Sequence, residues 1–188
     1  MNNFSFDTET REFLSNSYPV GIFDDNIITA VEVGKPEDGS AYLDITFENV
    51  KKGYTLRERI FAVDRVPDWS TEEKEINKLK AKIKHIMARF VPEDQMIFEA
   101  HGFIDMCEKV KERLDQFAVA AKARVSLITE YDRNFTYVVL KSKYPPFLAN
   151  ENDKPLAYSE AERRRNFPEE FEIPSIPGQD DTDAPVIQ

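Results

Sequence analysis

The order in which the hydrophobic period changes along the chain is the strongest constraint on its fold. Three segments with a two-residue period come first, at about 27–34, 41–49 and 54–63. A helical period follows, and the two-residue period returns at about 124–132 and 135–143. The pattern predicts a three-stranded antiparallel meander, a helical insertion and a closing hairpin.

The turns and the helix boundaries support these elements. Asp38-Gly39 and Gly53 supply residue types that tolerate a positive φ between antiparallel strands. Ser70 with Glu73 three residues later forms a capping-box pattern before a helix that Pro92 ends. A second helix is expected from about 98 to 117, with Phe103, Cys107, Met106, Val110, Leu114 and Phe117 on one side.

The predicted element order is that of the OB-fold, a partly open antiparallel barrel of five strands. We therefore expect a mainly β, OB-fold-like barrel over residues 1–150, with a two-helix insertion between strands 3 and 4 and with residues 1–25 packed on it. An α+β sandwich with the same element order is the alternative. Residues 151–188 are polar and acidic, and are expected to form a largely flexible tail that contains a short helix capped by Ser159.

The net charge of −10 resides at the two ends of the chain. Residues 1–25 sum to −4 and residues 167–188 to −6, so the 141 residues between them are neutral. A neutral body with acidic ends does not repel a polyanion as a uniformly acidic protein would. The charge map is therefore compatible with a nucleic-acid partner.

Several classes of protein are disfavoured by the sequence. The N-terminus lacks a signal-peptide pattern, and no segment approaches roughly 18 continuous apolar residues. With a single cysteine, Cys107, no intramolecular disulfide is expected, and we predict a cytoplasmic protein, in the host cytoplasm if it is viral. His85, His101 and Cys107 lack metal-ligand spacing, so neither a metal nor a cofactor nor catalysis is expected. A nuclease site on Asp24, Asp25 and Asp64 lacks the further residues that it needs.

Candidate binding residues lie on the second and third strands. Leu43, Ile45 and Phe47 share one face of the second strand with Ala41, and Leu56 and Ile60 share one face of the third. The opposite faces carry aromatic rings and arginines, which stack on bases and neutralise phosphates. The residues predicted to bind on these faces are Tyr42, Arg57, Arg59 and Phe61.

The last hairpin and the loops add a second group. Residues 118–144 carry five basic and two acidic residues, interleaved with aromatic ones. The residues predicted to bind here are Tyr131, Arg133, Phe135 and Tyr137, with Lys35, Lys51 and Lys52 on the loops. An ordinary solvated sheet face with cross-strand Arg–Glu pairs is the alternative interpretation. A stripe of Lys74, Lys78, Lys82, His85 and Arg89 on the first helix is open to the same two interpretations.

The whole layout resembles bacteriophage single-stranded DNA-binding proteins. The resemblance rests on the meander around "GKPEDGSAYLDITF", the helical insertion, the closing hairpin before "YPPF" and the acidic end "PGQDDTDAPVIQ". It implies an OB-fold body that holds the strand and an acidic tail that recruits replication or recombination proteins. Bacterial relatives end in a phenylalanine after the acidic run, which this chain lacks. The tail residues expected to bind a partner are Asp180, Asp181, Asp183, Val186 and Ile187.

The sequence therefore predicts a non-sequence-specific protein that binds single-stranded DNA in replication, recombination or repair. A protein-interaction or virion structural module that uses the same aromatic face is the alternative. Self-association and a preference for DNA or RNA stay open.

Overall fold

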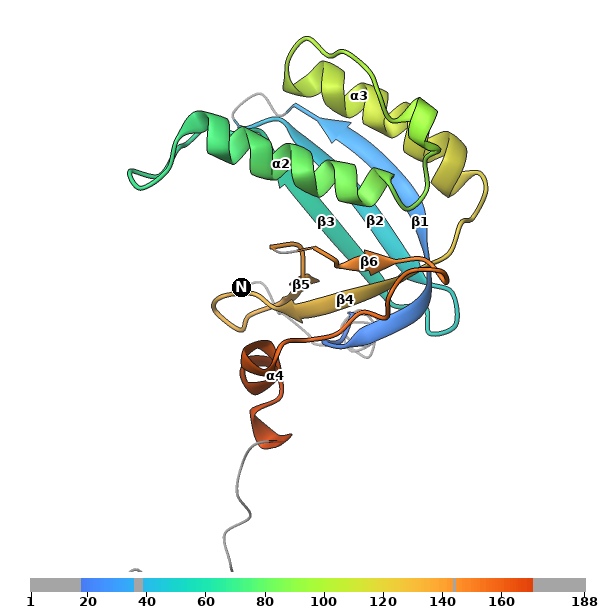
Figure 1. Cartoon of the computed structure of the whole chain (residues 1–188), viewed down its shortest axis with the longest axis vertical. Coiled ribbons are helices and arrows are strands. Elements are labelled where there is room, and N and C mark those ends of the chain that lie inside the picture. The colour runs from blue at the N-terminus through green and yellow to red at the C-terminus, as the bar shows by residue number, and fades with distance from the viewer. Residues whose placement is uncertain (1–17, 36–38, 144, 171–188) are drawn as a thin grey trace, which may run out of the picture. The chain divides into compact units, whose positions relative to one another are not determined.

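A computed structural model describes residues 18–35, 39–143 and 145–170 of the chain. The chain divides into two compact units between Ala157 and Tyr158. All strands within the described residues belong to the first unit (Figure 1). The sequence placed the corresponding boundary at residue 150.

Three antiparallel strands open the first unit. β1 (Ile22–Gly34) pairs with β2 (Tyr42–Asn49), and β2 pairs with β3 (Thr55–Phe61). The predicted meander is confirmed, although β1 begins five residues earlier than its two-residue period indicated. The polar run Asp24-Asp25-Asn26 interrupts the alternation there and conceals the first part of the strand.

The closing hairpin consists of β4 (Val125–Tyr131) and β5 (Val138–Leu140), and a short strand β6 (Leu148–Ala149) also pairs with β4. The strand order is β3-β2-β1-β4-β5. The sheet is open, because its hydrogen-bonded path ends at β3 on one side and at β5 on the other. A mainly β, antiparallel architecture is thus confirmed at the level of an open sheet of five to six described strands.

The predicted inner faces of β2 and β3 form the core. Leu43, Ile45 and Phe47 are buried, and so are Leu56 and Ile60. The helices contribute the buried side chains of Ile83, Ile86, Met87, Cys107, Val110 and Leu114. The two-residue period of these strands therefore identified the core face correctly.

Two helices, α2 (Glu72–Met87) and α3 (Phe103–Leu114), connect β3 to β4, as predicted (Figure 1). The expected capping box at Ser70 is wrong. The N-cap is Thr71, whose hydroxyl accepts the Lys74 N–H at 3.4 Å, while the Ser70 hydroxyl bonds Glu75. A 3₁₀ turn, η1 (Glu93–Gln95), separates the helices.

The second helix ends in a wider turn than the sequence predicts. The π-helical segment η2 (Asp115–Val119) follows α3 directly. A π-turn inserts one residue into the helical repeat, so Ala118 is buried and the predicted Phe117 is only half-buried.

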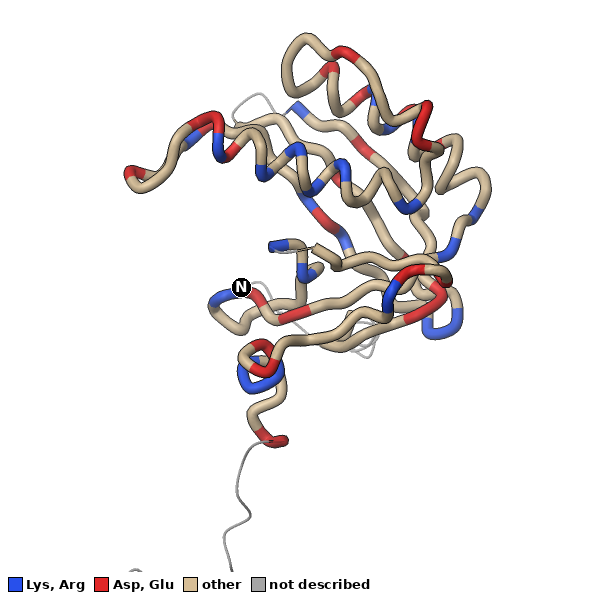
Figure 2. The backbone as a smooth tube through the Cα atoms, viewed as in Figure 1, with Lys and Arg blue, Asp and Glu red and all other residues tan. Residues whose placement is uncertain are grey.

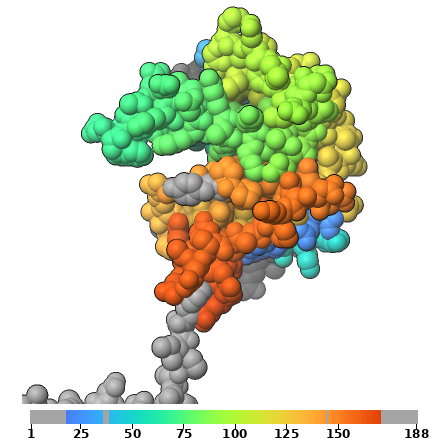
Figure 3. All heavy atoms as spheres, in the orientation of Figure 1, coloured from blue at the N-terminus to red at the C-terminus, as the bar shows by residue number. Residues whose placement is uncertain are grey.

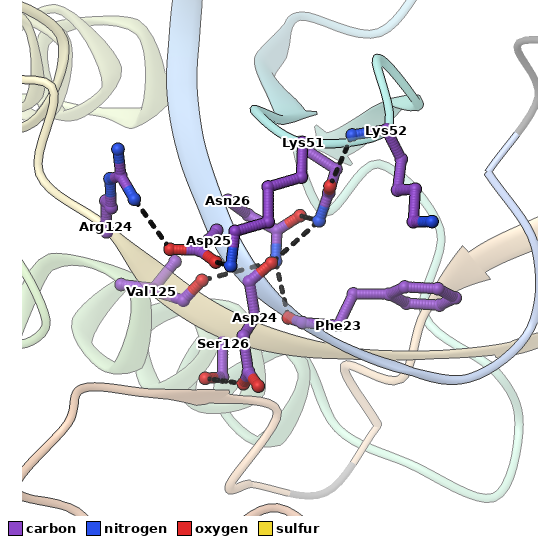
Figure 4. A network of polar contacts seen from close by, with 10 residues as sticks. Phe23, Asp24, Asp25, Asn26, Lys51, Lys52, Arg124, Val125 and Ser126 are labelled. Carbon is purple, nitrogen blue, oxygen red and sulfur yellow. Dashed lines mark hydrogen bonds and ion pairs between the residues drawn. The ribbon is translucent and has the colours of Figure 1, made fainter.

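β1 changes its pairing partner from β4 to β2 at Asn26, and Asn26 itself pairs with residues of both strands. Here Asp25 adopts a φ of 61°, and the register of the β1–β4 pair shifts. The Asn26 amide donates to the backbone oxygens of Phe23 at 2.6 Å and Val125 at 3.2 Å (Figure 4). The Asn26 side-chain oxygen accepts the Asn49 amide at 3.1 Å. These buried amides fix the bend in β1.

A buried ion pair joins β3 to α2. The Glu58 carboxylate lies on the inner face of β3 and binds the Lys82 ammonium of α2. The Leu140 N–H of β5 also hydrogen-bonds this carboxylate, so Glu58 links the two end strands of the open sheet. Burial raises the pKa of Glu58, and Lys82 acts in the opposite direction.

The C-terminal end of α2 contacts the segment around β6. His85 Nε2 accepts the N–H groups of Phe147 and Leu148, each at 3.3 Å. Arg89 Nε donates to the Leu148 carbonyl at 3.1 Å and lies 3.2 Å from the Asp153 carboxylate. Burial, with a contribution from Arg89, lowers the pKa of His85 to about 4.

The described part of the second unit is a short helix, α4 (Glu160–Asn166), followed by the turn η3 (Pro168–Glu170). Ser159 and Glu162 form a capping box, which confirms the predicted cap. The Tyr158 and Phe167 rings pack edge to face at 5.4 Å. The predicted tail residues Asp180, Asp181, Asp183, Val186 and Ile187 lie outside the described residues.

We expect Lys82→Met to destabilise the protein by on the order of 3 kcal/mol, because it leaves the Glu58 carboxylate buried without its cation. Lys80→Met, at an exposed position of the same helix, should cost less than about 0.5 kcal/mol. Urea unfolding at pH 8 measures both values. Lowering the pH should restore part of the loss, since a protonated Glu58 needs no cation. Equal stabilities for the two variants would contradict this role.

The His85 environment predicts a specific pH dependence. The unfolded chain takes up a proton on His85 near pH 6.5, whereas the folded chain does so only near pH 4. His85 therefore contributes stability above pH 6.5 that is lost as the pH falls toward 4. His85→Gln should flatten the stability profile over this window, and His101→Gln, at an exposed position, should not. Unchanged profiles in both variants would refute the assignment.

Candidate nucleic-acid interface

The outer face of β2 and β3 carries the strand cluster, which we define as Tyr42, Arg57, Arg59 and Phe61. Tyr42 and Phe61 are direct cross-strand partners, and their rings meet edge to face at 6.3 Å. The Arg59 guanidinium lies over the Tyr42 ring at 4.1 Å and 5.9 Å from that of Phe61. Phe61 is 51% exposed. The structure thus brings these predicted residues together on one surface.

A buried carboxylate holds the two arginines. Arg59 binds Asp44 in a bidentate manner, with Nε and Nη2 at 2.8 and 2.7 Å from its two oxygens. Arg57 also binds Asp44 and lies 3.5 Å from Glu32. These contacts are the cross-strand pairs of the alternative interpretation, with Asp as the main acceptor. They fix the guanidinium planes but neutralise much of their charge.

The Tyr42 ring lies on the backbone of Gly34 in the adjacent strand. The two residues are partners in the β1–β2 register, and a Cβ at position 34 would overlap the outer atoms of the ring. Gly34 therefore provides the space in which the ring packs. Because Tyr42 also contacts Arg59, its main role is to support the cluster, while Phe61 and the guanidiniums form the exposed part.

A second group, the hairpin cluster, comprises Tyr131, Arg133, Phe135 and Tyr137. Tyr131 ends β4 and packs against Phe135 at 5.8 Å between ring centroids. Phe135 and Tyr137 are 56% and 63% exposed, and Arg133 is also exposed. The loop between the strands is longer than predicted, because it spans residues 132–137.

The predicted loop lysines lie at two ends of the meander. Lys35 is exposed directly after β1, next to the Gly34–Tyr42 contact. Lys51 and Lys52 occupy the β2–β3 turn, at the opposite end of β2. Lys51 pairs with Asp25 (Figure 4). The structure thus separates these two lysines from the Tyr42 end of the strand cluster.

Asp25 is the acceptor at that opposite end. It binds Lys51 and also Arg124, whose Nη1 lies 2.8 Å from the carboxylate (Figure 4). Both contacts lower the pKa of Asp25. The basic groups here stabilise the bend of β1, which gives them a structural role independent of any ligand.

The predicted basic stripe on α2 is largely engaged within the protein. Figure 2 shows acidic residues at the N-terminal end of α2 and basic residues along the rest of the helix. Lys78 pairs with Glu75 at 2.6 Å, and Lys82, His85 and Arg89 make the contacts described above. The stripe therefore connects the helix to the sheet more than it presents charge to solvent.

Sequence reasoning missed one exposed aromatic residue. Trp69, the single tryptophan, is 77% exposed, and Lys78 Nζ lies 5.1 Å from its ring centroid. It sits in the turn before α2, the helix that is coloured green in Figure 3. The position of a Trp directly before a helix cap, outside the apolar period, was the available signal.

The chain matches no protein-family model, no curated protein and no solved structure.

Within residues 18–35, 39–143 and 145–170, no group of three or more His, Cys, Asp or Glu side chains is placed to hold a metal ion. Over those same ranges, no helix has the length and apolar character needed to span a bilayer. Burial raises the pKa of the Cys107 thiol to about 12.

We expect Gly34→Ala to displace the Tyr42 ring and to destabilise the protein by about 1–3 kcal/mol, the usual cost of overpacking. Tyr42→Ala removes the obstacle, so the double variant should be less destabilised than the sum of the two single variants. Chemical unfolding of all four proteins measures this coupling. Strict additivity would show that the ring does not depend on Gly34.

Proposed function

We propose that the protein binds single-stranded DNA without sequence specificity, on an OB-fold-like body. The open five-strand path with a helical insertion between β3 and β4 supports this fold. In OB-folds, the face of strands 2 and 3 and the loops between strands 1–2 and 4–5 bind oligonucleotides. The strand cluster, Lys35 and the hairpin cluster occupy those three places, and this coincidence is the observation that carries the proposal.

The chemistry of both clusters suits a strand of any sequence. The aromatic residues Phe61, Phe135 and Tyr137 are exposed, and base stacking on such rings contributes about 1–3 kcal/mol per base whatever the base. Arg59 supplies a cation beside the Tyr42 and Phe61 rings, and Arg57 and Arg133 are exposed arginines of the two clusters. Stacking needs no base-edge hydrogen bonds, so the site does not require a recognition helix.

The acidic C-terminal residues fit the same function. With a net charge of −6 over residues 167–188, a tethered tail competes with phosphate at a high effective concentration. Bound DNA then releases the tail for replication or recombination proteins. Recruitment through Asp180, Asp181, Asp183, Val186 and Ile187 is part of this proposal.

One observation favours a second function. Asp44 and Glu32 together offset the charges of Arg57 and Arg59, so the strand cluster is an aromatic surface with little net charge. Such a surface also suits docking of a protein partner, in virion structure or elsewhere. Salt separates the two functions, because only DNA binding releases condensed counterions.

We expect oligo-dT to bind better than about 10⁻⁴ M at low salt, with a log–log salt slope of about −0.7 per neutralised phosphate. Phe61→Ala or Phe135→Ala should weaken binding roughly 5- to 150-fold, as the loss of one stacked base requires. Fluorescence anisotropy of a labelled oligonucleotide measures both quantities. Replacing Asp180, Asp181 and Asp183 with Asn should tighten binding if the tail competes.

Ile97→Ala is the matched control, because Ile97 is 85% exposed on a segment outside both clusters. It should bind as the unmodified chain does. Affinity weaker than about 10⁻⁴ M for the unmodified chain would refute DNA binding. Binding that is unaffected by salt would favour the protein-docking function.

A further inference from the structure

The loop between β4 and β5 is organised around one side chain, that of Asp132. Its Oδ1 accepts the N–H groups of Thr136 and Tyr137 at 2.6 and 3.1 Å. Its Oδ2 accepts the Asn134 N–H at 3.2 Å and the Thr136 hydroxyl at 3.0 Å. One carboxylate thus binds four donors of the same loop.

The backbone of Asp132 completes the arrangement. Its carbonyl accepts the Phe135 N–H at 3.2 Å, and its own N–H donates to the Tyr137 carbonyl at 2.9 Å. Every main-chain N–H from 134 to 137 therefore donates to Asp132. Desolvation raises the pKa of Asp132, but these hydrogen bonds outweigh it and lower the pKa overall, which keeps the carboxylate ionised near neutral pH.

Phe135 is held in a strained conformation at the tip of this loop. Its φ is +57°, in the left-handed region that bulky side chains rarely adopt. Such strain persists where surrounding contacts impose it, commonly at functional sites. Here the imposed conformation accompanies a ring that is 56% exposed. Glycine at this position would satisfy the turn without strain, so the ring itself needs an explanation.

A carboxylate beside an anionic strand is electrostatically unfavourable. Asp132 lies within the hairpin cluster, where a neutral Asn would repel phosphate less and is also a good turn residue. Asn, however, presents only one acceptor oxygen, and its amide group would face donors that now bind the second oxygen of Asp132. The geometry of the loop therefore requires the carboxylate, although its negative charge is unfavourable beside an anionic strand.

We propose that Asp132 is a positioning residue that fixes Phe135 and Tyr137 as a preformed stacking platform for single-stranded nucleic acid. This inference rests on the proposed function. Holding the rings in place before the strand arrives reduces the ordering entropy that binding must offset. Asp132 itself does not contact the strand.

The test compares oligo-dT binding by full-length Asp132→Asn with that by Asp64→Asn, which removes one negative charge at an exposed position outside the loop. Electrostatics alone predicts equal or tighter binding for both variants. Positioning predicts at least fivefold weaker binding for Asp132→Asn, with an unchanged salt slope, and no loss for Asp64→Asn. Hydrogen exchange of residues 134–137 should accelerate in Asp132→Asn alone.

Phe135→Gly keeps the test meaningful if Asp132→Asn loses stability. It should keep or raise the melting temperature, because it relieves the positive φ, and yet weaken binding as Phe135→Ala does. Binding by Asp132→Asn that equals or exceeds that of the unmodified chain would overturn this inference while leaving the proposed function intact. Failure of the unmodified chain to bind oligo-dT would instead overturn the proposed function, and the inference with it.

Discussion

The sheet depends on two buried asparagines at the bend in β1. β1 serves as partner to both β2 and β4, and at the change of partner the Asn26 amide binds the Phe23 and Val125 carbonyls while the Asn49 amide binds the Asp24 carbonyl. Unpaired polar groups in this place would each cost about 1–3 kcal/mol. Because the bend directs one part of β1 to the meander and the other to the hairpin, the two proposed binding clusters owe their places to it. Glu58 then links β3 to β5 where no strand pairing does.

The aromatic rings of the two proposed binding clusters are held in place by different supports. In the strand cluster, a sheet provides the platform: Tyr42 rests on Gly34, and Asp44 holds both arginines. In the hairpin cluster, Tyr131 at the end of β4 packs against Phe135, and the carboxylate of Asp132 organises the loop that carries Phe135 and Tyr137. In both, an acid is placed beside the cations or rings, which lowers the local positive charge. Affinity for a strand would therefore depend on stacking more than on charge.

The sequence predicted those elements whose apolar residues recur at a regular spacing. Alternation identified the inner faces of β2 and β3, and the helical spacing identified the two inserted helices. The sequence did not predict the role of Glu58, which is buried on the inner face of β3, because a charged residue carries no hydrophobic signal. It also missed β6, since two residues carry no period, and the π-turn that buries Ala118. The hydrogen bonds of Asp132 and the ring–backbone contact at Gly34 are tertiary or loop features without a periodic signal.

If the proposed function is right, one strand contacts both aromatic clusters. Ultraviolet cross-linking of oligo-dT to the full-length protein, followed by mass spectrometry of the cross-linked peptides, tests it most directly. We expect cross-links at Phe61 on β3 and at Phe135 or Tyr137 in the β4–β5 loop. Saturable cross-links confined to other surfaces, such as the exposed residues of α3, would contradict it.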